Sequence, residues 1–237
     1  MMLTGQVFTI MSQTATDEQI SMIVKAADQY LFDEKVGGYR LNTDFKELKT
    51  DLGRMFGFAY GSKENGAVFS HMAVMYAFAL YKRGFVKEGY KALNQLYLQS
   101  SDFEHSRIYP GIPEYFNQNG RGLYSYLTGA ASWYMPPVLT EMFGVKGKLG
   151  DLSLEPKLMA EQFDEKGKAS ITSFFAERTL RLEYENPGCL EIGDYEIEEI
   201  WINDVKYPFQ QGEAIISRET IQMLNEDEEH ILRVILA

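Results

Sequence analysis

The sequence predicts an α+β protein with a helical domain over residues 1–150 and an antiparallel β-sandwich domain over residues 151–237. Apolar residues recur at helical spacing through the first part, and from Leu149 the period changes to two. The charges divide at the same place. Residues 1–150 carry 15 Lys and Arg against 14 Asp and Glu, whereas residues 151–237 carry 8 against 20. These observations indicate two domains of different composition.

The helical part begins with an apolar segment from Leu3 to Gln13, followed by a capping box, Thr16-Asp17-Glu18-Gln19. In such a box the Thr hydroxyl accepts a hydrogen bond from the backbone N–H three residues later, and the side chain there reaches back. We expect an amphipathic helix to follow, whose apolar face is formed by Ile20, Ile23, Val24, Ala27 and Leu31.

Three further helices are expected, over Ala67–Arg83, Phe85–Leu98 and Thr128–Phe143. Pro136-Pro137 should kink the last of them or start a 3₁₀ turn, because proline cannot donate a backbone hydrogen bond. Two long connections, Phe32–Gly66 and Gln99–Ser125, separate the helices, and long loops in a compact domain are usually functional. This order is typical of helical hairpins in an α/α barrel whose loops gather at one end.

The second part alternates between apolar and polar residues, as strands do when one face is buried. Asn203-Asp204 is placed to form a hairpin turn between Trp201 and Tyr207. The segments with strand character are Leu152–Leu154, Ala169–Phe175, Thr179–Glu185, Tyr195–Ile202 and His230–Leu236.

Composition excludes several classes of protein. A net charge of −11, with the excess acid in the second part, argues against a nucleic-acid-binding protein. No apolar run approaches the roughly 20 residues that a membrane span needs, and the first 16 residues lack a signal-peptide pattern. The single cysteine, Cys189, can form no internal disulfide and no metal site alone. A cytoplasmic location is therefore expected, with no membrane partner.

Two motifs have the residues for chemistry. The first, Gly61-Ser62-Lys63-Glu64-Asn65-Gly66, presents an ammonium, a carboxylate and an amide just before a helix that carries His71 near its start. The second runs from Tyr126 to Trp133 and sets Thr128-Gly129 at the start of a helix. Free backbone N–H groups at a helix start favour an anion, and an imidazole beside them would suit phosphate.

Taken singly, these residues have simpler explanations. His71 is as a rule a core histidine with one hydrogen bond, and Lys63 and Glu64 are solvated loop charges. Thr128 before a small residue is most commonly a helix cap. Only the joint pattern points to a site for a phosphate and a sugar.

Together the two motifs resemble the C-terminal part of the inverting disaccharide phosphorylases of glycoside hydrolase family 94. The resemblance extends approximately from Leu3 to Asn186. It implies that the helices are the last ones of an (α/α)6 barrel. It also implies that the strands form a jelly-roll-like β-sandwich, which the chain enters at Asp151–Pro156.

The resemblance also assigns the site. It implies that His71, Thr128 and Gly129 bind phosphate, and that Lys63 and Glu64 hydrogen-bond the sugar whose glycosidic bond is broken. The substrate would be a β-glucoside disaccharide or oligosaccharide, with inorganic phosphate as co-substrate and neither a cofactor nor a metal. Phosphate is itself an anionic nucleophile, so the second carboxylate of an inverting glycosidase is not needed. The products would be an α-sugar 1-phosphate and a shortened acceptor.

The chain departs from the family pattern in one important respect. The family's general-acid aspartate lies far upstream of the histidine motif, and no match to its surroundings is present before His71. We therefore expect the chain to be one part of a split or truncated phosphorylase, inactive alone. Its first helices, around Val7, Ile10 and Ile23, should expose an apolar face that binds an upstream polypeptide or a second copy.

Two other functions remain open at this stage. The chain could be a non-catalytic carbohydrate-binding or structural module that retains the fold. It could also be a hydrolase that uses Glu64 and Glu114 as its carboxylate pair, if their two loops converge.

Overall fold

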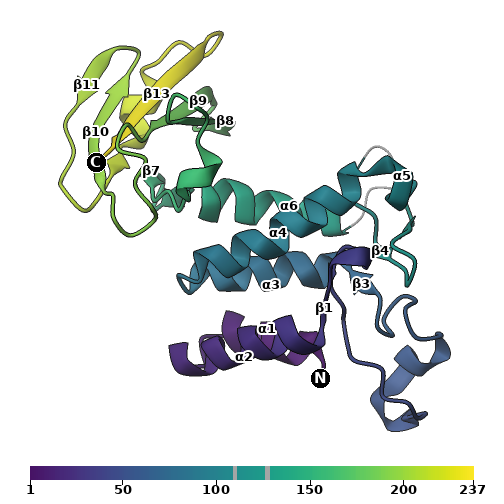
Figure 1. Cartoon of the computed structure of the whole chain (residues 1–237). Coiled ribbons are helices and arrows are strands. Elements are labelled where there is room, and N and C mark those ends of the chain that lie inside the picture. The colour runs from purple at the N-terminus through teal and green to yellow at the C-terminus, as the bar shows by residue number, and fades with distance from the viewer. Residues whose placement is uncertain (109–110, 126–128) are drawn as a thin grey trace. The chain divides into compact units, whose positions relative to one another are not determined.

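The structure, a computed structural model, describes residues 1–108, 111–125 and 129–237. The chain divides into two compact units, Met1–Pro137 and Val138–Ala237. Helices dominate the first unit and strands the second, which confirms the α+β class (Figure 1). The change of structure was predicted near residue 150.

The first unit is built around α3 (Ser70–Lys82). This helix has almost no polar face, since nine of its 13 residues are buried, and a helix that is apolar all round belongs in a core. It packs against α1, α4 and α6 (Figure 1). The helices of this unit are α1 (Leu3–Met11), α2 (Asp17–Tyr30), α3, α4 (Val86–Ser101), the short α5 (Phe103–Ser106) and α6 (Gly129–Pro136).

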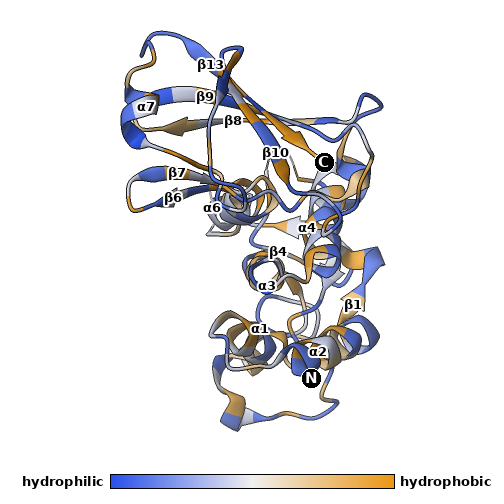
Figure 2. Cartoon of the chain, turned by 90° about the vertical axis from the view of Figure 1, so that its left-hand side faces the viewer, coloured by the Kyte–Doolittle hydropathy of each residue, from blue (hydrophilic) through white to orange (hydrophobic). Residues whose placement is uncertain are grey.

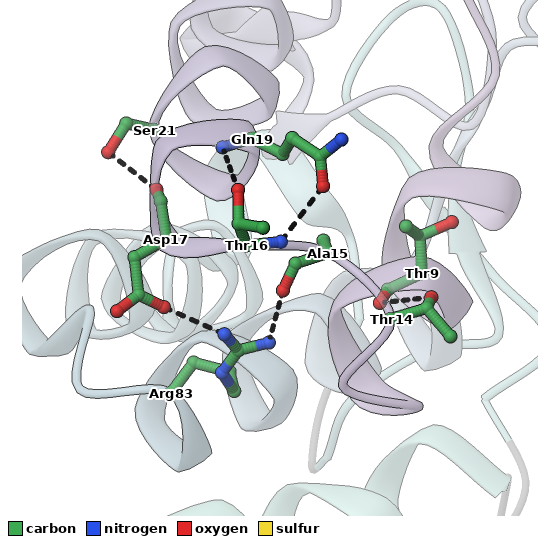
Figure 3. Close-up of polar contacts among 8 residues, drawn as sticks. All are labelled: Thr9, Thr14, Ala15, Thr16, Asp17, Gln19, Ser21 and Arg83. Carbon is green, nitrogen blue, oxygen red and sulfur yellow. Dashed lines mark hydrogen bonds and ion pairs between the residues drawn. The ribbon is translucent and has the colours of Figure 1, made fainter.

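The predicted capping box is confirmed at the start of α2. The Thr16 hydroxyl accepts a hydrogen bond from the Gln19 backbone N–H at 3.3 Å, and the Gln19 side chain accepts one from the Thr16 N–H at 2.9 Å. Figure 3 shows both bonds, together with Arg83, which donates to the Ala15 carbonyl and to the Asp17 carboxylate. The start of α2 is thus held by local bonds and by a residue at the end of α3.

We expect Thr16→Ala to lower the free energy of unfolding by about 1 kcal/mol, the usual cost of losing an N-cap side chain. Denaturant unfolding followed by circular dichroism measures this. Ser21→Ala is the control, because the Ser21 hydroxyl only bonds the Asp17 carbonyl one turn back, inside the helix. Equal stability of the Thr16→Ala protein and the wild type would contradict a stabilising role for the box.

The apolar face expected to be exposed on α1 is buried instead. Val7 and Ile10 are fully buried, together with Leu3, and α1 packs against α3. The prediction was wrong for these residues because one face of a nine-residue helix can be covered by a helix that lies 60 residues later in the chain. The exposed apolar side chains of α1 and α2 are others: Phe8, Met22 and Tyr30.

The two long connections contain short strands that the sequence pattern did not reveal. Strands β3 (Val68–Phe69), β4 (Tyr115–Phe116) and β5 (Gly122–Leu123) form a three-stranded antiparallel sheet. Two others, β1 (Phe32–Asp33) and β2 (Gly38–Tyr39), form a hairpin around the turn η1 (Glu34–Val36). A 3₁₀ segment, η2 (Thr50–Gly57), completes the first connection. The sheet β3–β4–β5 joins the two connections directly before α3.

The helix that carries Pro136-Pro137 changes register at these residues. After α6, Pro137–Met142 forms a π-helical segment, η3, in which the Phe143 N–H donates to the Val138 carbonyl five residues back. The expected change at the proline pair is present, but the 3₁₀ alternative was wrong. Two adjacent prolines remove two donors, so the hydrogen-bond ladder resumes in a different register.

The second unit contains two sheets. One has five strands in the order β11–β10–β13–β9–β8, and the other has three in the order β12–β7–β6. Figure 2 shows β6 and β7 across from β8 and β9. The strands are β6 (Val145–Lys148), β7 (Asp151–Leu154), β8 (Lys168–Phe175), β9 (Arg178–Glu185), β10 (Ile197–Ile202), β11 (Val205–Tyr207), β12 (Ile215–Ile216) and β13 (Glu229–Leu236). Two short helical segments lie between them, η4 (Ala160–Gln162) and α7 (Arg218–Gln222).

The prediction of a purely antiparallel domain was wrong at the centre of the larger sheet. Strands β9 and β13 pair in parallel, with Leu182 opposite Leu232, whereas the other pairs are antiparallel. Alternation of apolar residues identifies a strand and its buried face, but it does not give the direction of the neighbouring strand. The buried faces of β9 and β13 nonetheless alternate as expected, with Leu180, Leu182, Leu232 and Val234 inside.

The predicted hairpin turn is confirmed. Asn203 and Asp204 connect β10 to β11 and both have positive φ, 46° and 67°, as a two-residue type I′ turn requires. Cys189 is exposed and free. Among the residues that the structure describes, no helix combines the length and apolar character of a membrane span.

Candidate functional site

His71 is the second residue of α3 and lies against the start of α6. A Cβ atom built on Gly129, the first residue of α6, would be 3.3 Å from His71 Nδ1, so only glycine leaves the two this close without adjustment. The Trp133 ring, one turn later in α6, lies 5.5 Å from the imidazole centroid to centroid. The packing of α3 against α6 therefore places the imidazole beside a helix N-terminus.

The surroundings of the His71 imidazole favour its neutral form. Burial lowers its pKa below the ordinary value, because the charged form loses hydration there. Nε2 is a buried atom that bonds to none of the described residues. A buried polar atom without a partner costs free energy, which a bound ligand or ordered water can recover.

The positive end of the α6 dipole lies at Gly129, next to the imidazole. The first four N–H groups of any helix lack an intrahelical acceptor, and the helix dipole makes this end positive. Gly129 itself is exposed. Thr128, predicted to bind phosphate with it, lies outside the described residues.

The loop from Gly61 to Gly66 presents Lys63 and Glu64 at its tip. The Lys63 ammonium lies 4.0 Å from the centroid of the Tyr124 ring and 3.9 Å from Glu114 Oε2. A hydrogen bond to the Tyr124 side chain raises the pKa of Lys63 above its ordinary value, and the Glu114 carboxylate acts in the same direction. The Lys63 ammonium thus lies over the face of an aromatic ring, beside a carboxylate.

Glu64 is held by one of its two oxygens. Oε1 accepts a hydrogen bond from Arg54 Nη2 at 2.6 Å, whereas Oε2 is buried and bonds to none of the described residues. Arg54 belongs to η2, and its side chain is 76% exposed. The free oxygen leaves Glu64 able to accept a hydrogen bond from a hydroxyl group of a ligand.

Glu114 connects the loop to the histidine. Its carbonyl accepts a hydrogen bond from the Ser70 N–H at 3.0 Å, directly before His71, while its carboxylate faces Lys63. The β3–β4 pairing makes this possible, because it lays the second long connection along the start of α3. The structure therefore brings Lys63 to Glu114, and Glu114 to the residue before His71.

Three residues of this region were not predicted as parts of the site: Trp133, Tyr124 and Arg54. Trp133 follows Gly129 by four residues, a spacing that would have placed both on one helix face. Tyr124 and Arg54 come from irregular connections, where sequence spacing carries no comparable signal. The two carboxylates of the hydrolase hypothesis contact different cations: Glu64 contacts Arg54, and Glu114 contacts Lys63. These contacts do not pair the two carboxylates, so the hydrolase stays a hypothesis.

The family model for the catalytic domain of the glycosyl hydrolase 94 superfamily matches residues 1–144. The chain belongs to this superfamily. The match covers both motifs, including Lys63, Glu64, His71 and Gly129, so the family resemblance deduced from the sequence is confirmed.

Curated relatives of this superfamily member are phosphorylases. Cellobionic acid phosphorylase of Neurospora crassa is 26% identical over 170 residues, which are 66% of this chain and 21% of the relative. Solabiose phosphorylase of Paenibacillus borealis is 25% identical over 162 residues, 65% of this chain and 21% of the relative. N,N'-diacetylchitobiose phosphorylase of Vibrio proteolyticus is 28% identical over 201 residues, 81% and 24%. The chain spans less than a quarter of the length of these relatives.

Proposed function

We propose that this chain forms part of an inverting glycoside phosphorylase and supplies its phosphate-binding residues His71, Thr128 and Gly129. The observation that carries the proposal is the contact between the His71 imidazole and the first residue of α6. It combines an imidazole whose buried Nε2 bonds to none of the described residues with the positive end of a helix. These are the features of an anion-binding site.

The sugar would bind next to the anion. Lys63 would donate hydrogen bonds to sugar hydroxyl groups, and Glu64 Oε2 would accept hydrogen bonds from them. Glu114 connects these residues to the phosphate-binding ones, because its carboxylate faces Lys63 and its carbonyl accepts from the Ser70 N–H next to His71. The relatives' names indicate disaccharide substrates, and we propose a β-glucoside with inorganic phosphate as co-substrate. We further propose that the helices of residues 1–137 complete an (α/α)6 barrel with the rest of the enzyme.

The reaction follows from these parts. A phosphate oxygen attacks the anomeric carbon, the bond to the leaving sugar breaks, and the leaving oxygen takes a proton from a general acid. The configuration inverts, so the products are an α-sugar 1-phosphate and the shortened acceptor. The chain's own contribution is positioning, because holding a nucleophile against its target lowers the barrier without a second carboxylate.

Phosphate binding is testable on the chain itself through the titration of His71. We expect added phosphate to raise the pKa of His71, since a nearby anion stabilises the imidazolium that burial disfavours. By the same coupling, an anion should bind more tightly when the imidazole is protonated. Sulfate stays a dianion over this pH range, so its affinity should rise as the pH falls through the His71 titration. Proton NMR titrations in phosphate, in sulfate and in chloride at equal ionic strength measure both effects.

The other two histidines provide internal references for this titration. His105 is exposed and pairs with Asp102, and His230 lies in the second unit, bonded to Asn203 and to the Asn225 carbonyl. The ring proton signals of these two residues should not respond to phosphate. A His71 pKa that is the same in phosphate and in chloride would contradict the proposed site.

We propose further that the general acid comes from outside these 237 residues. Without it the chain alone should not catalyse phosphorolysis, because general acid catalysis typically contributes about 10²–10⁴ to the rate. The measurement is phosphate consumption by the purified chain with a β-glucobiose, compared with the His71→Ala protein. Turnover above that control would contradict this proposal but not the phosphate site.

We propose that a contact with an upstream polypeptide, or with a second copy, involves exposed apolar side chains of α1 and α2. Phe8, Met22 and Tyr30 are all more than half exposed there. Isolated chains should therefore associate through these side chains, and a strictly monomeric chain in sedimentation experiments would contradict that expectation.

A further inference from the structure

Asn42 is a buried amide that none of the proposed binding roles uses. The residue is completely buried, in the first long connection, 21 residues before Lys63. The backbone of the preceding residue, Leu41, is held from two sides. The Leu3 N–H donates to the Leu41 carbonyl at 2.8 Å, and the Leu41 N–H donates to the Ala67 carbonyl at 2.8 Å. Asn42 thus sits on a rigid segment between α1 and the strand that leads into α3.

The Asn42 side chain bonds the base of the Lys63-Glu64 loop. Its Oδ1 accepts from the Gly66 N–H at 2.8 Å, and its Nδ2 donates to Asn65 Oδ1 at 3.2 Å and to the Thr43 carbonyl at 3.0 Å. Gly66 is also held at its carbonyl, which accepts a hydrogen bond from Arg40 Nη1 at 2.7 Å. One buried amide therefore fixes both residues that close the loop.

The tip of the loop depends on this base. The Gly61 N–H donates to the Asn65 carbonyl at 2.6 Å, and the Asn65 N–H donates to the Ser62 carbonyl at 3.0 Å, so the loop closes on Asn65. Lys63 at the tip has a φ of 46°, in the left-handed region that non-glycine residues adopt only when their surroundings hold them there. A displaced Asn65 would change the direction of both charged side chains.

We infer that Asn42 is a positioning residue for sugar binding, which acts through Asn65 and Gly66 on Lys63 and Glu64. The inference rests on the proposed sugar-binding role of these two residues. It assigns to a buried amide a function that stability alone would not reveal, since Asn42 contacts the loop and not the ligand.

The test combines amide hydrogen exchange with cellobiose titrations of the full chain, both by NMR. In Asn42→Ala the Gly66 amide should lose its protection, and cellobiose affinity should fall roughly tenfold or more, because small displacements of binding groups are costly. Asn119→Ala is the matched control, an exposed asparagine on the neighbouring turn, and should bind as the wild type does. Unchanged cellobiose affinity in Asn42→Ala would overturn the inference.

A second variant covers the case in which Asn42→Ala does not fold. Asn42→Asp keeps an acceptor for the Gly66 N–H but turns a second acceptor toward Asn65 Oδ1 and the Thr43 carbonyl. Affinity should fall at neutral pH and recover in part at low pH, where the protonated carboxyl donates one hydrogen bond. Wild-type affinity for this variant at neutral pH would also overturn the inference.

The double variant distinguishes this inference from the proposed function. If Asn42 acts on Lys63 and Glu64, Asn42→Ala should weaken cellobiose binding less in the Lys63→Ala protein than in the wild type, whereas independent losses would add. Additive losses overturn the positioning role. Unchanged affinity in Lys63→Ala overturns the proposed sugar site and this inference with it.

Discussion

Replacing His71 with alanine in a catalytically complete phosphorylase that contains this chain should lower the rate of phosphorolysis by about 10²–10³, the usual effect of removing one preorganised donor to a transition-state anion. The imidazole lies against the start of α6, and its buried Nε2 bonds to none of the residues that the structure describes, so its loss would remove the hydrogen bond that we propose it makes to phosphate. Initial rates at varied phosphate and fixed disaccharide measure the effect.

The control for this prediction is His105→Ala. His105 is 70% exposed on α5 and bonds Asp102. The His105→Ala substitution should leave the rate of phosphorolysis unchanged. The loss in His71→Ala should appear mainly in the dependence on phosphate, and a loss independent of phosphate concentration, with unchanged phosphate affinity, would contradict the assignment of His71 to the anion.

Gly144→Ala should destabilise the second unit more than any surface substitution in it. Gly144 has a φ of 65°, and a Cβ built there would lie 2.0 Å from the carbonyl carbon of Glu155. The two backbones are also bonded, because the Glu155 N–H donates to the Gly144 carbonyl at 2.9 Å. A left-handed alanine costs about 1–2 kcal/mol and overpacking about 1–3 kcal/mol, so we expect a loss of roughly 3 kcal/mol or more.

Gly150→Ala separates the two causes. Gly150 has a φ of 102°, so alanine there has at least the same backbone strain, but nothing lies within 4 Å of the Cβ position. Its cost should stay near the strain alone, about 1–2 kcal/mol. Thermal unfolding followed by near-ultraviolet circular dichroism compares the two variants. Equal melting temperatures would show that the segment around Glu155 moves aside without cost.

Local patterns in the sequence were sufficient for the longer helices and strands and for the motifs. The capping box at Thr16 was predictable because its donor and acceptor are three residues apart. The turn at Asn203-Asp204 was predictable because the backbone it needs favours those residue types. The two motifs around His71 and Gly129 were recognisable as family motifs for the same reason, since each is a short continuous stretch.

The tertiary structure decided which segments meet. The parallel pairing of β9 with β13 and the burial of Val7 against α3 depend on segments about 50 to 70 residues apart, and no period in the sequence encodes them. The contact of Glu114 with both Lys63 and the Ser70 N–H arises only when β4 pairs with β3. Local hydrogen bonding and residue preference act within a few residues, whereas the burial of apolar faces selects partners anywhere in the chain. For this reason the sequence by itself could propose the residues of the site, while the fold determined which residues each of them contacts.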